Sequence, residues 1–413
     1  MTRQPLCRFC RAPLSRIFLD LGDQPLANSY LTPEQLAAGN EPVFPLCTRV
    51  CDACFLVQAD HDVPAEAIFD DSYAYFSSFS PGWVEHARRY AEAMIERFGL
   101  GPESLVVEVA SNDGYLLQHF LARDVPVLGI EPTANTAEAA RARGVRTDVD
   151  FFNAETGQAL AARGDRADLM AANNVLAHVP DLNAFVGGFQ HVLKPEGVLT
   201  FEFPHLLNLI EKVQFDTIYH EHYSYLSLLA VEQVLGAHGL RVFDVELLPT
   251  HGGSLRLFCC RQAAGYGETE ALAALRAREA EAGLNRGETY DGFAARCEAV
   301  RDSFREFLAT AKDDGKAIAA YGAAAKGNTF LNYCGTTAAD IVCAYDANPA
   351  KQGRYLPGSH IPVFAPAAVA ETRPDYVLIL PWNLKDEITR QLAFIADWGG
   401  RFVIASPATR VLD

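Results

Sequence analysis

The fold of the middle of the chain is decided by the stretch SLVVEVA at residues 104–110 and by the four residues SNDG at 111–114 that follow it. The first stretch is a short apolar run rich in valine, which is typical of a strand buried in a sheet. The second is a turn, and an apolar helical pattern begins directly after it. A buried strand that passes through a tight turn into a helix starts a βαβ unit, so this stretch predicts a parallel sheet covered by helices.

The same alternation extends outward over residues 73–245. Further strands are expected at 125–131, 168–174 and 198–203. A helix rich in alanine and arginine is expected at 133–143, and Asp181 is a suitable N-cap for another. This order of elements predicts an α/β domain with a doubly wound, Rossmann-like sheet.

A second, smaller α/β pattern follows in residues 246–413. It begins with a hairpin-like piece at 255–258 and a long charged helical stretch at 267–313. The strands expected after this stretch are 317–321, 341–345, 376–380 and 401–405. The predicted fold class is therefore α/β, with two doubly wound Rossmann-like domains and a small N-terminal domain. Two such units in one chain indicate that two ligands meet between them.

Composition narrows the range of partners. The chain has 413 residues, 49% of them hydrophobic, and a formal net charge of -17. A negative field of this size repels nucleic acid and anionic membrane, and no apolar run approaches the ~18 residues that span a bilayer. The first five residues hold no apolar core of a secretory signal. We expect a cytoplasmic monomer or small homo-oligomer with small-molecule ligands and no nucleic-acid or membrane partner.

Residues 1–72 are rich in Cys, Pro and turn residues and too short for a conventional core. They contain two CxxC pairs, formed by Cys7, Cys10, Cys51 and Cys54. Four such thiolates can bind Zn²⁺ tetrahedrally, and a small domain gains folding free energy from the site. Protein fills all four positions, so we predict a structural zinc ion. The alternative is a reduced pair without metal, or a redox-active pair.

The turn at 110–114 lacks the dinucleotide fingerprint G-x-G-x-x-G, because Ala110 and Asn112 replace the first two glycines. An acidic, amide-rich turn suits S-adenosylmethionine, which carries no phosphate. An acid at the end of the second strand can accept hydrogen bonds from both ribose hydroxyls. The candidate donor-binding residues are Glu108, Ser111, Asn112, Asp113, Gly114, Glu131, Pro132, Asp150, Phe151, Asn173 and Asn174. The alternative is a doubly wound sheet that binds no ligand.

Titratable side chains gather in the segment FDTIYHEHY at residues 215–223. A base that removes a proton alpha to a ketone needs a pKa near the working pH, which histidine has. A Tyr hydroxyl or a second His can donate to the enolate oxygen that develops. The segment lacks the H-E-x-x-H spacing of zinc proteases. The candidate catalytic residues are His222, Tyr219, Glu221, His178 and Tyr75.

A second turn, YGAAAKGN at residues 321–328, follows an expected strand and opens a helix. Backbone donors at the start of that helix, together with Lys326, suit a pyrophosphate. An acid at the end of the next strand suits a ribose. The candidate substrate-binding residues are His251, Gly252, Tyr321, Lys326, Asn328, Asp346, Asn348 and Lys351. The alternative is a purely structural domain.

One set of motifs runs in order through nearly the whole chain. It comprises the two CxxC pairs, EVASNDG at 108–114, NNVLAHVP at 173–180, YHEHY at 219–223, HGG at 251–253 and YGAAAKG at 321–327. Together these motifs resemble those of S-adenosylmethionine-dependent nucleotide-sugar C-methyltransferases, in particular the TDP-3-keto-deoxysugar C-3 methyltransferases. The resemblance implies a zinc-binding domain at 1–72, a methyltransferase domain at 73–245, and a C-terminal Rossmann-like domain at 246–413 that helps to bind a nucleotide sugar. The sequence departs from the family pattern at position 110, where Ala replaces the more usual Gly.

The resemblance also implies roles for the titratable residues. It makes His222 the candidate base, with Tyr75, His178, Tyr219 and Glu221 around the sugar. The hypothesis is that His222 removes a proton alpha to the ketone of an NDP-keto-sugar, with TDP as the favoured nucleotide, and that the enolate carbon takes the methyl group of S-adenosylmethionine. The alternatives are a sugar O-methyltransferase, an NAD-dependent nucleotide-sugar oxidoreductase, and a non-catalytic zinc- or ligand-binding protein.

Overall fold

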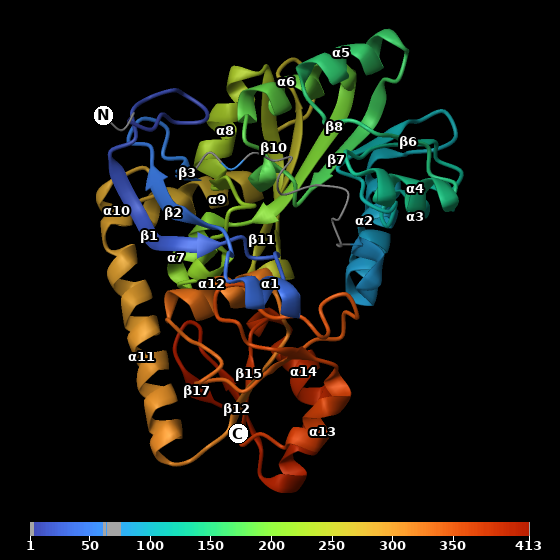
Figure 1. The fold of residues 1–413 in the computed structure, drawn as a ribbon. Helices are drawn as coiled ribbons and strands as arrows, with labels where there is room; N and C mark the ends of the chain where they lie inside the picture. Colours follow the sequence, from blue (N-terminus) through green and yellow to red (C-terminus); the bar gives the residue numbers. More distant parts are fainter. Residues whose placement is uncertain (1–3, 61–62, 64–75, 413) are drawn as a thin grey trace.

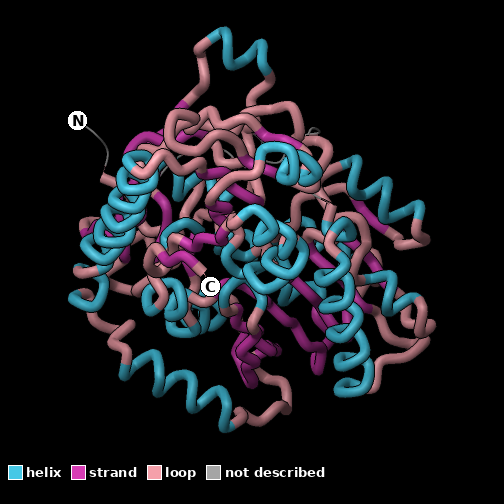
Figure 2. Tube along the Cα trace, turned by 90° about the horizontal axis from the view of Figure 1, so that it is seen from below, coloured by secondary structure: helices cyan, strands magenta, loops and turns pink. Residues whose placement is uncertain are grey.

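The computed structural model describes residues 4–60, 63 and 76–412, and these form three sheets with helices around them (Figures 1 and 2). The sheets correspond to the small N-terminal domain and the two α/β domains that the sequence predicts. The candidate catalytic residue Tyr75 lies outside the described residues. In the described part of the chain, no helix is both long and apolar enough to cross a membrane.

The N-terminal sheet has four antiparallel strands in the order β1-β2-β3-β9. Its strands are β1 (Arg16–Pro25), β2 (Val43–Val50), β3 (Val57–Ala59) and β9 (Ser224–Tyr225), and α1 (Pro33–Ala38) follows β1 in sequence. Strand β9 comes from the middle of the chain, with Val57 paired to Tyr225 and Gln58 to Ser224. The N-terminal domain is thus hydrogen-bonded directly to the residues that follow the His/Tyr segment.

The middle sheet has seven strands in the order β10-β11-β8-β7-β4-β5-β6. The strands are β4 (Val106–Val109), β5 (Val127–Ile130), β6 (Thr147–Asp148), β7 (Ala167–Asn173), β8 (Leu193–Pro204), β10 (Leu240–Leu248) and β11 (Ser254–Arg261). Strands β4 to β8 are parallel, and the β10-β11 hairpin adds to β8 antiparallel. The hairpin satisfies the open edge of β8. The domain boundary expected at residue 245 therefore falls inside β10, and the piece expected at 255–258 in the third domain belongs to this middle sheet.

Helices cover both faces of the middle sheet. They are α2 (Pro81–Phe98), α3 (Leu117–Leu121), α4 (Ala134–Ala142), α5 (Ala154–Ala162), α6 (Leu182–Val192) and α8 (Leu228–Ala237). Helix α7 (Leu206–Glu211) packs instead with residues of the N-terminal and C-terminal domains. Alternate residues of β4 face opposite ways: Val107 packs with Phe185 and Phe189 of α6, whereas Val106 packs with Tyr90 of α2 and Phe120 of α3. The expected N-cap is confirmed, because Asp181 accepts a hydrogen bond from the N–H of Ala184 at 3.0 Å.

The C-terminal sheet has six strands in the order β14-β13-β12-β15-β16-β17. They are β12 (Ile318–Tyr321), β13 (Ala344–Tyr345), β14 (Val363–Phe364), β15 (Tyr376–Ile379), β16 (Arg401–Ile404) and β17 (Arg410–Val411), with β17 alone antiparallel among the described strands of this sheet. Its helices are α12 (Ala325–Tyr333), α13 (Val369–Thr372) and α14 (Lys385–Gln391). The strand expected at 341–345 is confined to its last two residues.

The long charged helical stretch expected at 267–313 consists of three helices. They are α9 (Glu270–Glu281), α10 (Glu288–Asp291) and α11 (Phe293–Asp313). Phe293 of α11 stacks on Phe18 of β1, with ring centroids 4.3 Å apart, and Phe304 further along packs against Phe330 of α12. Helix α11 therefore runs from the N-terminal sheet to the C-terminal domain and braces one against the other (Figure 1).

Candidate active site

The turn after β4 is tight and partly left-handed. Ala110 has φ +56° and Asn112 φ +49°, conformations that cost energy in residues with a side chain, and Gly114 has φ +77°. A Cβ on Gly114 would lie 3.0 Å from a methyl carbon of Val145, so this position needs glycine. The Ala found at position 110 in place of the family's Gly thus occupies a strained position. Strain of this kind is typical of ligand-binding turns.

Two acids lie side by side at the carboxyl ends of β4 and β5. Glu131 accepts the backbone N–H of Asn112 at 2.8 Å and that of Thr133 at 3.0 Å. Burial raises the pKa of Glu131, and burial together with the charge of Glu131 raises that of Glu108 well above its ordinary value. Glu131 therefore fixes the turn through two backbone N–H groups, and its closeness to Glu108 disfavours the ionised form of that second acid.

Several buried polar atoms at this edge have no hydrogen-bond partner among the described residues. They are Oε2 of Glu108, Oγ of Ser111, Oδ1 of Asp113, Oδ1 of Asn173 and both side-chain atoms of Asn174. Native proteins rarely leave such groups unpaired unless a ligand or water satisfies them. These atoms are mostly acceptors, and they suit the α-ammonium group and hydroxyls of S-adenosylmethionine. The donor-binding residues predicted near β4 and β7 thus fit that ligand.

The loop before α2 closes over the turn. The N–H of Ser77 donates to Oδ1 of Asn112 at 2.9 Å, and the hydroxyl of Ser78 hydrogen-bonds to Asp113. Arg143, at the C-terminal end of α4, forms an ion pair of 2.9 Å with Asp113. The Asp113 side chain is fully buried. The acid of the turn is therefore held by neighbours on two sides, which leaves its other oxygen for a ligand.

Other predicted donor-binding residues lie further out. Asp150 and Phe151 are exposed beyond the edge strand β6, and Phe152, next in sequence, packs in the core instead. Pro132 is half-buried between Glu131 and the start of α4. The structure thus groups the residues of β4 and β7 closely but leaves Asp150 and Phe151 at the rim.

The His/Tyr segment lies between the N-terminal and middle sheets. The ring centroids of Tyr219 and His222 are 4.2 Å apart, and those of His178 and His222 are 4.6 Å apart. Nδ1 of His222 hydrogen-bonds to the carbonyl of Thr217 at 2.8 Å, and Nδ1 of His178 to that of Glu221 at 2.9 Å. Four of the five predicted catalytic residues are therefore together, each held by its neighbours.

Burial shifts the pKa values of the histidines and of Glu221 in opposite directions. It lowers the pKa of His178 to about 4 and, aided by His178, that of His222 well below its ordinary value. It raises the pKa of Glu221 to about 7. At neutral pH both imidazoles are uncharged, which is the form that accepts a proton.

The turn Thr250–Gly252 joins β10 to β11 in the middle sheet and contacts the C-terminal domain. His251 has φ +53°, and its ring lies 5.2 Å from that of Trp83 in α2. Gly252 has φ +89°, and a Cβ there would lie 2.3 Å from the Trp382 ring. His251 also lowers the pKa of His222, so it faces the His/Tyr segment. The sequence prediction for His251 and Gly252 thus falls on a close contact between domains.

Lys326 faces Asp216 across the same contact. Its ammonium lies 4.9 Å from the Trp382 ring centroid and donates to Asn383 at 2.7 Å, while the indole N–H donates to Asp216 at 2.6 Å. Asp216 is 2% exposed, and its second oxygen has no hydrogen-bond partner among the described residues. Sequence reasoning missed Asp216, although it is the second residue of the FDTIYHEHY segment.

The remaining substrate-binding candidates lie in two groups. Asp346 accepts the N–H groups of Ala323 and Asn348 at 2.7 and 2.8 Å, and Lys351 lies 3.9 Å from Asp346. Asn328 is fully buried, and its side-chain Oδ1 has no hydrogen-bond partner among the described residues. Tyr321, by contrast, packs in the apolar cluster on the other face of the C-terminal sheet. These residues line the first βα turn of the C-terminal domain, apart from Tyr321.

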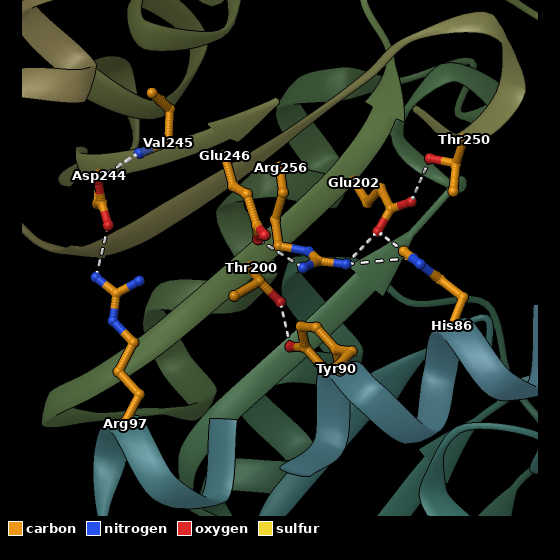
Figure 3. Close-up of polar contacts among 10 residues, drawn as sticks. All are labelled: His86, Tyr90, Arg97, Thr200, Glu202, Asp244, Val245, Glu246, Thr250 and Arg256. Carbon is orange, nitrogen blue, oxygen red and sulfur yellow. Dashed lines mark hydrogen bonds and ion pairs between the residues drawn. The ribbon is translucent and has the colours of Figure 1, made fainter. Parts of the chain in front are cut away.

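A buried charge network joins β8, β11 and α2 beside the Thr250–Gly252 turn (Figure 3). Glu202 of β8 accepts from Arg256 at 2.6 Å and contacts His86 of α2 at 3.0 Å. Its other oxygen accepts the hydroxyl of Thr250 at 3.1 Å. Burial opposes the ionisation of Glu202, yet His86 and Arg256 hold its pKa at about 2. The network therefore ties α2 to the strained Thr250–Gly252 turn. Its members come from distant positions in the chain, so no local spacing of residues predicts it.

The four predicted metal ligands lie together. The sulfur atoms of Cys7, Cys10, Cys51 and Cys54 are all within 4.8 Å of one another. The amide of Gln58 donates to Cys7 at 3.3 Å, as second-layer donors do at thiolate metal sites. Cys47 lies outside this group. The donor set fits a tetrahedral zinc ion with no open position.

Comparison with known proteins agrees with this division into three parts. Family models described as "Putative zinc binding domain", "Methyltransferase domain" and "C-methyltransferase C-terminal domain" match residues 7–69, 83–245 and 249–407. The C-methyltransferase NovU of Streptomyces niveus is 37% identical over 407 residues, which cover 98% of this chain and 96% of that protein. The chain belongs to this C-methyltransferase family.

More distant similarities concern parts of the C-methyltransferase. A ubiquinone biosynthesis O-methyltransferase of Rhodopseudomonas palustris (strain BisA53) is 28% identical over 159 residues, covering 33% of this chain and 62% of that protein. Among solved structures, magnesium protoporphyrin IX methyltransferase (ChlM) from Synechocystis PCC 6803 with bound SAH matches with a TM-score of 0.35 and 15% identity. That match covers 44% of this chain and 84% of the other.

Family membership confirms several predictions from the sequence. The C-methyltransferase is an S-adenosylmethionine-dependent enzyme of α/β fold with an N-terminal zinc-binding domain. The sequence correctly placed the four thiolates in one cluster and the two nucleotide-type turns at the starts of helices.

Proposed function

We propose that this C-methyltransferase transfers a methyl group to a carbon alpha to the ketone of a nucleotide-linked keto-deoxysugar, with TDP as the nucleotide. The observation that carries the proposal is the arrangement around His222. Its Nδ1 is anchored on the Thr217 carbonyl, which leaves Nε2 with a lone pair, and Tyr219 and His178 flank the ring. A neutral imidazole beside two hydrogen-bonding groups suits proton abstraction next to a carbonyl.

The donor belongs at the carboxyl edge of β4 and β7. Glu108, Ser111, Asp113, Asn173 and Asn174 would hold it through their buried, unpaired polar atoms. S-adenosylmethionine supplies an electrophilic methyl group on a positively charged sulfur. The acids of this edge attract that charge, and the loop over the turn excludes water from it.

The acceptor belongs between the His/Tyr segment and the C-terminal domain. We place the sugar ring beside His222 and the nucleotide along the turn that holds Lys326, Asp346 and Lys351. Lys326 and Lys351 are partly exposed, and burial lowers the pKa of each. The negative charge of a pyrophosphate would offset the cost of keeping these ammonium groups charged.

Methyl transfer proceeds through an enolate of the sugar. Nε2 of His222 takes the proton on the carbon alpha to the ketone, and the electrons of that C–H bond form the enolate. Tyr219 donates a hydrogen bond to the enolate oxygen, because the one N–H of neutral His178 is already held by the Glu221 carbonyl. A new C–C bond then forms to the methyl group as the sulfur–methyl bond breaks, so the sulfonium becomes a neutral thioether and the proton stays on His222.

The direct test is methyl transfer to a panel of TDP-, GDP- and CDP-linked keto-deoxysugars, with the product analysed by NMR. We expect a new C–CH₃ group on a TDP-sugar. Replacement His222→Asn or Tyr219→Phe should lower turnover by about 10²- to 10⁴-fold while donor binding stays intact. The surface variant His191→Asn is the control. A methyl ether in the product would favour the O-methyltransferase alternative, and full activity of both site variants would refute the mechanism.

A further inference from the structure

The segment Ala27–Leu31, between β1 and α1, is a strap that reaches out of the N-terminal domain. The carbonyl of Ala27 accepts from the buried Asn328 at 2.7 Å, and the hydroxyl of Tyr30 donates to the carbonyl of Ala323 at 2.5 Å. The backbone of Leu31 exchanges hydrogen bonds with Tyr355 at 3.1 and 2.9 Å. The strap is therefore fixed on the C-terminal domain at three points.

One side chain of the strap faces the other way. The amide Nδ2 of Asn28 donates to Oε1 of Glu221 at 2.5 Å, across a separation of 193 residues. Glu221 is 9% exposed, whereas Asn28 itself is exposed. The backbone carbonyl of Glu221 accepts from His178, which contacts the ring of His222. An N-terminal residue thus holds the carboxylate next to the proposed base.

We propose that Asn28 is a positioning residue, through which the zinc-binding domain sets the orientation and ionisation of Glu221 in the acceptor site. The sequence assigned that domain a structural role alone. The strap gives it a part in the reaction, because a segment that bridges to the C-terminal domain also orients an acid of the His/Tyr segment.

Other charged groups act on Glu221 from neighbouring elements. The ammonium of Lys351 attracts its negative charge. Burial, together with the charges of Asp346 and Glu221, raises the pKa of Tyr30, and the imidazole of His178 donates to the backbone carbonyl of Glu221. Lys351 is itself shared, since it also faces Asp346. Both Lys351 and the Asn28 amide favour the ionised carboxylate, against burial, which favours the neutral acid. Removing Asn28 alone therefore shifts Glu221 toward the protonated form.

The inference deepens the proposed function, because it treats Glu221 as part of the acceptor site. Its test nevertheless works without substrate. The full-length zinc-loaded protein is labelled with ¹³C at the side-chain carboxyl carbon of Glu, and the Glu221 signal is assigned by its absence in Glu221→Gln. The titration midpoint of this signal reports the carboxylate directly, whether or not any keto-sugar is methylated.

Asn28→Ala should raise that midpoint by about one pH unit, the size of shift that the loss of one charge-assisted hydrogen bond produces. Asn28→Asp keeps the shape but places a second negative charge beside Glu221, so it should raise the midpoint as well. The neighbouring variant Ser29→Ala is the matched control, since the Ser29 backbone N–H bonds to Leu26 within the strap. Zinc content measured for each variant shows that the domain is folded.

The kinetic counterpart is the pH dependence of kcat/KM. The limb assigned to Glu221 should move to higher pH in Asn28→Ala by the same amount as the NMR midpoint, and Ser29→Ala should match the wild type. Unchanged midpoints in both Asn28 variants, with zinc retained, would overturn the inference. Inactivity of the wild type toward every keto-sugar, with the midpoint still shifted in Asn28→Ala, would overturn the proposed function and leave the positioning role standing.

Discussion

His222 and His178 lie ring against ring, with centroids 4.6 Å apart and planes inclined by 64°. Each Nδ1 meets a backbone carbonyl, which only accepts hydrogen bonds, so each Nδ1 carries the hydrogen and each Nε2 is the basic atom. The pair therefore offers two oriented imidazoles between the zinc-binding domain and the carboxyl edge of the middle sheet.

The pH dependence of kcat/KM should not be set by the ionisation of a histidine. Burial holds the pKa of His178 at about 4 and that of His222 well below its ordinary value, whereas it raises the pKa of Glu221 to about 7. We expect kcat/KM to fall below a midpoint near 7 as Glu221 gains a proton. In Glu221→Gln that limb should vanish at a lower overall rate. A limb that persists unchanged in this variant would exclude Glu221 as its source.

Stability should decline in mild acid because of the buried imidazoles. A histidine whose pKa is lowered on folding binds a proton more readily in the unfolded chain. The stability it contributes is therefore lost as the pH falls from the unfolded value of 6.5 toward about 4 for His178. We expect Tm to drop between pH 7 and pH 5, and to drop less in His178→Asn, whose amide can still donate to the Glu221 carbonyl. Equal slopes in the two proteins would contradict this.

Loss of zinc should disrupt the His/Tyr segment, where the acceptor is proposed to bind, and leave the binding of S-adenosylhomocysteine intact. A structural zinc site of this kind contributes about 10 kcal/mol or more to the folding of its domain. The sheet it supports contains β9, which follows directly after His222 and Tyr223. Chelation, or the variant Cys51→Ser, should abolish methyl transfer while S-adenosylhomocysteine still binds by calorimetry. Retention of full activity in a metal-free sample would show that the zinc-binding domain does not shape the site.

The network in Figure 3 makes Glu202 and Glu246 a matched pair for stability. Both accept from Arg256, but the Glu202 side chain is fully buried and that of Glu246 is 48% exposed. Glu202→Gln leaves a buried guanidinium short of a countercharge, so we expect unfolding free energy to fall by about 3 kcal/mol. Glu246→Gln should cost about 1 kcal/mol or less, because water screens an exposed pair. Urea unfolding measures both, and equal losses would contradict the burial argument.

The local features of this fold were readable in the sequence. The CxxC pairs have the spacing of a metal site, and the valine-rich run before Ser111 has the pattern of a buried strand, so both were located correctly. Short-range patterns also placed Asp181 at a helix start. Each of these signals arises within a few residues of chain.

The features that sequence reasoning missed depend on contacts between distant residues. Strand β9 has two residues, and only its pairing with β3 makes it a strand. Three hydrogen bonds of the site likewise join residues that are far apart in the sequence. They link Asn28 to Glu221, Trp382 to Asp216 and His86 to Glu202. The piece expected at 255–258 was placed with the C-terminal domain, whereas it lies in β11, and only the register with β8 assigns it to the middle sheet.

The most direct test of the account is hydrogen exchange into the acceptor without methyl transfer. The enzyme is incubated in D₂O with a TDP-keto-deoxysugar and S-adenosylhomocysteine, which has no methyl group to give, and NMR follows the proton alpha to the ketone. The account predicts that the wild type and His191→Asn exchange this proton rapidly and that His222→Asn does not. Exchange at the wild-type rate in His222→Asn, with donor and sugar both bound, would contradict the claim that His222 is the base.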